Sequence, residues 1–329
     1  MCVEQAYLST KAAIDEGYKL MEVEFPPLPQ NAMENEAVGA DVLLKAQIQH
    51  TREFARLFEG KQVAIVFPDI VERNRFVEDV SFGKKKDGGG IRYAALGGGY
   101  KGNWIEQIWV KQEYVSPVEE DDDILVVIGA SAQELPDVRK LCEEAGDRPV
   151  VLFNLKLQTL RGDFGLPAFP PKVPPPPAPG AASTARCPDR AAARASQSLH
   201  YEWLSSALPT YHVLPRAYSR TIARPPFLIN YSGCLFRTYP GKWQVLLEVP
   251  DEQNGGGRYE SVRLESVRPA LSEVREMLAQ ELQLDSLDTE EQRSQTFFGL
   301  DLATLRSGVV VKTWWEQDTD KTASDNWRK

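Results

Sequence analysis

Val63-Ala64-Ile65-Val66-Phe67 is one of four short apolar runs that decide the fold of the first half of this chain. The others are residues 20–25 (LMEVEF), 124–128 (ILVVI) and 150–153 (VVLF). Runs this short, nearly continuous and rich in β-branched residues are typical of strands buried on both faces, as in a parallel sheet. A turn residue or polar group follows each run, so we expect each strand to end there.

Helical periodicity fills the intervals between these runs. Apolar residues such as Leu44, Ile48 and Ala55 recur at three- and four-residue steps, and Gly60 follows where a helix often ends on a left-handed residue. The predicted helices cover residues 3–17, 35–59 and 132–145, and two weaker strands are predicted at 91–96 and 104–115. This alternation predicts an α/β fold, a Rossmann-like and mostly parallel sheet with flanking helices.

The second half of the chain changes its period. Strand patterns at 233–238, 243–249 and 259–267 are separated by turn residues, which favours an antiparallel meander that extends the sheet. Pro269 then precedes a helical pattern at 270–283.

Residues 167–198 separate the two halves. They are rich in proline and alanine, a composition typical of polyproline II or disorder. Such a segment cannot pack a core, so it separates the predicted elements of the first half from those of the second.

Composition restricts the function. The chain of 329 residues has a formal net charge of −9, which disfavours nucleic-acid binding because phosphate contacts need a basic surface. Its four cysteines form no CxxC pair and its three histidines are scattered, so we predict neither a structural zinc site nor a cofactor. No apolar run approaches the roughly 18 residues that a membrane span requires.

The carboxyl ends of the strands are the predicted place for a ligand, because open α/β sheets bind ligands there. Asp69, Ser131 and Asn154 follow three of the apolar runs and are the candidate binding residues. An acid such as Asp69 can bind a cation or serve as a base. The alternative is that all three residues make turns and helix caps.

Glu22 and Glu24 alternate with apolar residues, so both are predicted to point to one face of their strand. Two carboxylates on one face can bind a metal or perform acid–base chemistry. The more common structural explanation is the exposed face of an edge strand, and we expect that arrangement here.

Three further motifs have ordinary explanations. Residues 97–102 (GGGYKG) match GxGxxG but follow a weak strand, so a glycine-rich loop is favoured over a nucleotide site. Residues 84–86 (KKK) are interpreted as a solvated loop, with contact to an acidic partner as the alternative. Trp314-Trp315 is interpreted as part of a packed terminal strand rather than an exposed anchor.

Several stretches, in this order along the chain, resemble an uncharacterised family of plants, algae and cyanobacteria that is catalogued as a domain of unknown function. The resembling stretches are residues 5–7 (QAY), 11–17 (KAAIDEG), 21–29 (MEVEFPPLP), 66–69 (VFPD), 146–154 (GDRPVVLFN), 236–243 (FRTYPGKW) and 267–269 (VRP). The family includes a chloroplast Low Photosystem II Accumulation protein and a domain fused to a plastid adenylate kinase.

The resemblance implies a chloroplast protein, stromal or thylakoid-associated, and supplies no catalytic residues to transfer. We therefore expect a non-enzymatic photosystem assembly or scaffold factor that binds protein partners and has no membrane span, so any contact with the thylakoid is peripheral. Because the resembling stretches lie on both sides of residues 167–198, the resemblance also implies a single α/β domain over residues 1–283, interrupted by this disordered insertion, and a C-terminal extension over 284–329. The alternative is a nucleotide- or small-molecule-binding protein with its site at the strand ends, a hypothesis that Asp69, Ser131 and Asn154 motivate.

Overall fold

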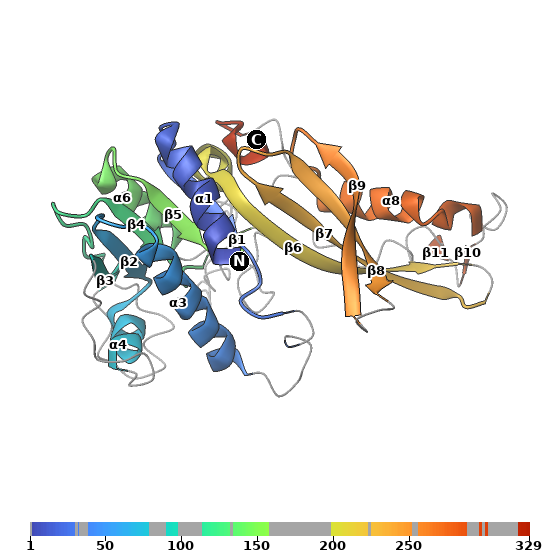
Figure 1. Cartoon of the computed structure of the whole chain (residues 1–329), viewed down its shortest axis with the longest axis horizontal. Coiled ribbons are helices and arrows are strands. Elements are labelled where there is room, and N and C mark those ends of the chain that lie inside the picture. Colours follow the sequence, from blue (N-terminus) through green and yellow to red (C-terminus); the bar gives the residue numbers. More distant parts are fainter. Residues whose placement is uncertain are drawn as a thin grey trace, which may run out of the picture.

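A nine-stranded sheet organises the computed structural model (Figure 1). The structure describes residues 2–29, 32, 39–78, 90–97, 114–131, 134–157, 199–222, 225–251, 256–287, 296–297, 300–301 and 322–329. The strand order is β3-β2-β4-β5-β1-β6-β7-β8-β9. From β3 to β6 neighbouring strands pair in parallel, and from β6 to β9 they pair antiparallel. The predicted mostly parallel sheet with an antiparallel C-terminal meander is therefore confirmed.

Helices and strands alternate along the first half of the chain, and strands predominate in the second half. Most of the elements predicted from the sequence are present with boundaries that differ by a few residues. The elements are α1 (Cys2–Asp15), β1 (Leu20–Glu24), α3 (Ala40–Arg56), β2 (Val63–Phe67), α4 (Ile70–Glu78), β3 (Ile91–Ala95), β4 (Ile124–Val127), α6 (Leu135–Ala145), β5 (Val150–Phe153), η2 (Leu199–Trp203), η3 (Leu204–Ser206), β6 (Leu208–Thr221), β7 (Leu228–Thr238), β8 (Trp243–Asp251), β9 (Gly256–Glu265), α8 (Leu271–Glu281), η4 (Leu284–Leu287), β10 (Thr296–Phe297), β11 (Leu300–Asp301) and η6 (Asn326–Arg328).

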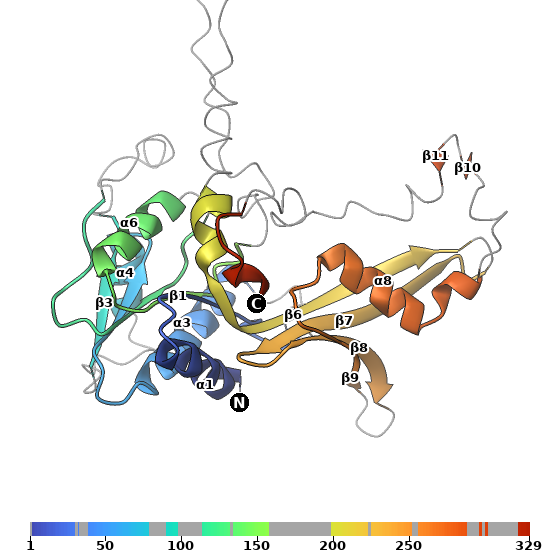
Figure 2. The ribbon, with the colours of Figure 1, turned by 90° about the horizontal axis from the view of Figure 1, so that it is seen from above.

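Both faces of the parallel half are covered, which explains its continuous apolar strands. Side chains such as Ile65 and Phe153 pack with Phe54 of α3 on one face, which we call the α3 face. Val66 and Leu152 pack with Leu141 on the opposite face, which we call the α6 face. Figure 2 shows α1 on one side of the sheet and α6 and α8 on the other. A strand buried on both sides carries no polar alternation, as the sequence pattern predicted.

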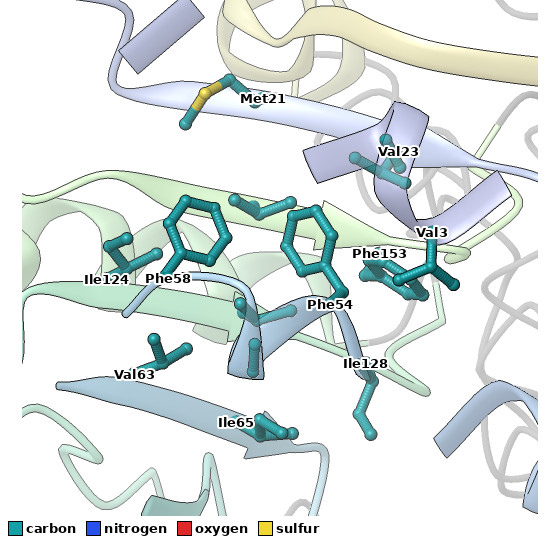
Figure 3. Packing of buried hydrophobic residues seen from close by; sticks show 14 of the residues in the cluster. Val3, Met21, Val23, Phe54, Phe58, Val63, Ile65, Ile124, Ile128 and Phe153 are labelled. Carbon is teal, nitrogen blue, oxygen red and sulfur yellow. The ribbon is translucent and has the colours of Figure 1, made fainter. Parts of the chain in front are cut away.

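Aromatic side chains at the end of α3 and just after it fill the core on the α3 face. Phe54 and Phe58 lie over the strands (Figure 3), and their ring centroids are 5.3 Å apart in an edge-on arrangement. Phe54 also contacts Phe153, with 5.2 Å between centroids. Gly60 adopts φ +73° just after this helix, the left-handed conformation predicted for it.

Strand β6 joins the two halves of the sheet. It pairs in parallel with β1 and antiparallel with β7, so one strand belongs to both the α/β unit and the meander. Helix α8 packs on the meander, where Val274 and Leu278 meet Leu235, Trp243 and Val245. The C-terminal residues also pack on the domain, because Trp327 is buried in the cluster of the α6 face.

Helix α4 and strand β6 were not predicted, nor were the short elements η2, η3, η4, η6, β10 and β11. Helix α4 follows β2 directly, and β6 contains Pro209, Pro215 and several polar residues that obscure a strand pattern. Most of the predicted strand at 104–115, the Pro/Ala-rich segment 167–198, the lysines at 84–86 and Trp314-Trp315 lie outside the described residues, as does most of the glycine-rich loop. Among the described helices, none combines the length and the hydropathy of a membrane-crossing segment.

Candidate functional site

Asp69 caps helix α4. Its Oδ1 accepts hydrogen bonds from the backbone N–H groups of Val71 at 2.7 Å and Glu72 at 2.8 Å, the geometry of an N-cap residue. The structure therefore favours the helix-cap explanation for Asp69 over the ligand explanation.

Replacing Asp69 with alanine is expected to lower the free energy of unfolding by about 1 kcal/mol, because two N–H groups of the first turn lose their acceptor. Asp69→Asn keeps that acceptor and serves as the control, with an expected loss of a few tenths of a kcal/mol at most. Urea unfolding measures both. Equal losses for the two variants would contradict the capping role.

Ser131 and Asn154 also make hydrogen bonds that fix the chain next to their strand ends. The backbone N–H and the hydroxyl of Ser131 donate to Glu134 Oε2 at 2.8 and 2.6 Å, just before α6. Asn154 has φ 53°, and its Oδ1 accepts the backbone N–H of Phe25 at 2.8 Å, which ties the end of β5 to the end of β1. Since β2, β4 and β5 are neighbours, the three residues follow strand ends along one edge, as predicted.

A small cavity of about 110 Å³ lies at this edge, and none of the three predicted residues lines it. Its walls come from the ends of β2 and β4 and from α3 and α4. The chain passes from β2 to β3 on one side and then returns to β4 on the other, so this is a topological switch point, the usual ligand position in such sheets. The lining residues are Leu44, Lys45, Gln47, Ile48, Phe67, Glu72, Arg75, Phe76, Ile128 and Gly129.

Glu22 and Glu24 do not lie on an edge strand, so that prediction is wrong. Strand β1 lies between β5 and β6, in the middle of the sheet. Both side chains do share one face, the α6 face. Glu24 is 4% exposed, and burial, with a smaller contribution from repulsion by Glu22, raises its pKa to about 7. Glu22 pairs with buried Arg268, whose Nη1 is 3.5 Å from the carboxylate.

A buried polar row continues from Glu24 across the sheet. Glu24 is in register with His212 of β6, and His212 is in register with Arg237 of β7. Trp243 follows on β8, with the guanidinium carbons of Arg237 and Arg268 each 5.1 Å from its ring centroid. We call these residues the arginine row: Glu24, His212, Arg237, Trp243 and Arg268.

Residue-by-residue reasoning did not predict the arginine row. A signal was present, because Glu24, Arg237, Trp243 and Arg268 all occur in the stretches that carry the family resemblance. Those stretches are far apart in the sequence, and only the sheet brings them together.

An apolar groove of about 1180 Å³ lies on the other side of the meander, between its open face and the start of the chain. Residues from β6 to β9 form one wall, while α1, the loop Pro26–Pro29 and α3 form the other. Apolar residues lining it include Val3, Pro27, Leu57, Val213, Phe236, Leu246 and Tyr259. Helix α8 covers the opposite face of the meander, and none of the helices in the described part of the chain covers β8 and β9 on the groove face.

A family model described as "Domain of unknown function (DUF1995)" matches residues 1–276. The chain belongs to this family. The match spans the parallel half, the arginine row and both walls of the groove, so all three features lie within the DUF1995 domain. Comparison with curated proteins and with solved structures gave no match. Within the described residues, no group of three or more His, Cys, Asp or Glu side chains is placed to hold a metal ion.

Proposed function

We propose that this chain is a chloroplast protein that acts in photosystem assembly by binding a short apolar segment of a partner protein in the groove. The chloroplast location and the assembly role rest on the sequence resemblance. That resemblance extends to the chloroplast Low Photosystem II Accumulation protein and to the domain fused to a plastid adenylate kinase. The apolar groove is the observation that supports binding of a partner segment at this surface.

The groove combines volume with exposed apolar surface. Tyr259 is 44% exposed within it, and Leu264, farther along the same strand, is 62% exposed. Contiguous apolar surface of this kind marks interaction sites in many proteins. Charged residues occur at the groove, including Glu53, Arg56 and Glu248, so the partner segment is expected to be apolar with polar flanks.

Tyr259→Asp is expected to abolish capture of the partner, because a carboxylate in the apolar contact surface is left desolvated and unpaired. The experiment is affinity capture from chloroplast extract, with bound proteins identified by mass spectrometry. Val77→Asp on α4 is the matched control, since Val77 is 51% exposed and does not line the groove.

The expected result is that the wild-type chain and Val77→Asp recover photosystem or thylakoid assembly components and Tyr259→Asp does not. Equal recovery by all three would place the binding surface elsewhere. Recovery of no thylakoid protein by the wild-type chain at low salt would contradict the assembly role.

The cavity at the switch point favours a second candidate function, binding of a small molecule or part of a nucleotide at the strand ends. The cavity is smaller than most ligand pockets, which span roughly 300–1,000 Å³, so it suits a small group rather than a whole nucleotide. Lys45, Gln47, Glu72 and Arg75 supply polar contacts around an apolar interior.

A ligand of this cavity is expected to raise the melting temperature of the native chain by mass action. A thermal-shift screen of nucleotides and small phosphates detects it. Leu44→Trp, which fills the cavity, is expected to remove the shift, whereas Leu8→Trp on the exposed surface of α1 keeps it. Flat melting curves at millimolar ligand would argue against this function.

A further inference from the structure

His212 and Arg237 present hydrogen-bond donors that have no acceptor among the described residues. The two residues are opposite each other on β6 and β7, so their side chains are cross-strand neighbours on one face. Both are deeply buried, with exposed fractions of 0% and 3%. The buried atoms without a partner are Nδ1 of His212 and Nε and Nη1 of Arg237.

The tautomer of His212 follows from its contact with Arg268. Nη2 of Arg268 lies 3.4 Å from Nε2 of His212, and a guanidinium can only donate, so Nε2 accepts. Burial and the neighbouring arginines lower the pKa of His212 well below its ordinary value, so the ring is neutral. A neutral ring that accepts at Nε2 carries its proton at Nδ1. Nδ1 is therefore a third donor beside the two of Arg237.

The positive charge of Arg237 also lacks a carboxylate partner in the described part of the chain. The nearby carboxylate of Glu22 is paired with Arg268. The rings of Trp243 and Tyr239 lie 5.1 and 5.5 Å from the Arg237 guanidinium. Aromatic rings stabilise a cation in part, but they neither neutralise it nor accept all of its N–H groups. A buried, unpaired charge is strongly destabilising.

We infer that His212 and Arg237 bind a small oxyanion, a phosphate or a carboxylate, at the arginine row. An oxyanion supplies both the negative charge and pairs of acceptor oxygens on one central atom, which suits the fork of a guanidinium. A neutral water molecule would satisfy N–H groups but would leave the charge of Arg237 without a counter-ion. The site is separate from the groove and from the switch-point cavity, so it can be present whether or not either proposed function holds.

The test compares the melting temperature of the full chain in chloride with that in inorganic phosphate, in a phosphate monoester and in acetate, at constant ionic strength. Saturating oxyanion, at about a hundredfold excess over its dissociation constant, is expected to raise the melting temperature by roughly 5 to 10 °C. Arg237→Met is expected to lose this shift. Arg263→Met is the control, because it removes an exposed arginine from β9 of the same sheet. This variant is expected to show the same shift in melting temperature as the wild-type chain. The comparison among the three anions distinguishes free phosphate from a phosphorylated or carboxylated metabolite.

A second measurement does not depend on the folding of a variant. Wild-type chain that is equilibrated with phosphate, desalted and then denatured is expected to release a single equivalent of phosphate per chain. Shifts of equal size in all three proteins would overturn the inference, because they would indicate a general ion effect. Absence of both a shift and a released anion in the wild-type chain would overturn it as well.

Discussion

Replacing Trp243 with alanine is expected to lower the free energy of unfolding by about 4 kcal/mol, one of the two largest effects predicted here. The side chain has an exposed fraction of 0% and packs in the cluster between the meander and α8. Its Nε1–H donates to the backbone carbonyls of Arg328 at 3.3 Å and Lys329 at 3.0 Å. The alanine variant therefore loses core packing, the contacts with two guanidinium groups and the link to η6.

Chemical denaturation with urea measures this loss, and Trp243→Phe is the matched control. Phenylalanine keeps an aromatic ring between the arginines but removes the N–H donor, so we expect a loss of about 1 to 2 kcal/mol. A loss below about 1 kcal/mol for the alanine variant would contradict the packing of Trp243 described above.

Glu24→Gln is expected to stabilise the chain at alkaline pH by up to about 3 kcal/mol, with little effect below about pH 4. The pKa of Glu24 rises from 4.5 to about 7 in the folded state, chiefly because burial penalises the charged form. Between these two pKa values the folded state binds more protons than the unfolded state. Stability therefore falls as the pH rises from about 4.5 through about 7.

Glutamine removes the titration and retains an oxygen for the backbone N–H of Lys156, which donates to Glu24 Oε2 at 3.1 Å. Unfolding free energies measured across this pH range test the prediction. Glu59→Gln, at an exposed position just after α3, is the control and should follow the wild-type curve. Parallel curves for the wild-type chain and Glu24→Gln would show that Glu24 is ionised in both states.

The local pattern of apolar and turn residues was sufficient to predict the buried strands and most of the helices. Residues 63–67 form β2 with the predicted boundaries, because five consecutive apolar residues between turn signals have few alternatives in a folded chain. Strand β6 was not predicted, because its extended conformation depends on pairing with the neighbouring strands rather than on its own sequence pattern. Its backbone pairs with β1 on one side and β7 on the other, while its own sequence mixes prolines and polar residues with apolar ones.

The candidate sites were only partly accessible to sequence reasoning. The alternation of Glu22 and Glu24 correctly placed both on one face, but it cannot give the position of their strand in the sheet. That position decides whether the carboxylates meet water or Arg268. Asp69 and Ser131 were correctly located at strand ends, where Oδ1 of Asp69 and the N–H and hydroxyl of Ser131 make hydrogen bonds within their own turns.

The sequence by itself determined most of the segments that form strands and helices, because hydrophobic periodicity and turn residues act within a few residues of one another. Helix α4 and strand β6 are the main exceptions. Only the tertiary structure decided the strand order. That order creates the switch-point cavity and brings His212, Arg237 and Arg268 together around Trp243, with Glu24 in register with His212 on the neighbouring strand. The physical reason is that pairing between β1 and β6 joins residues such as Met21 and Leu208, which are distant in the chain. Such contacts depend on the whole packed core and leave no local pattern.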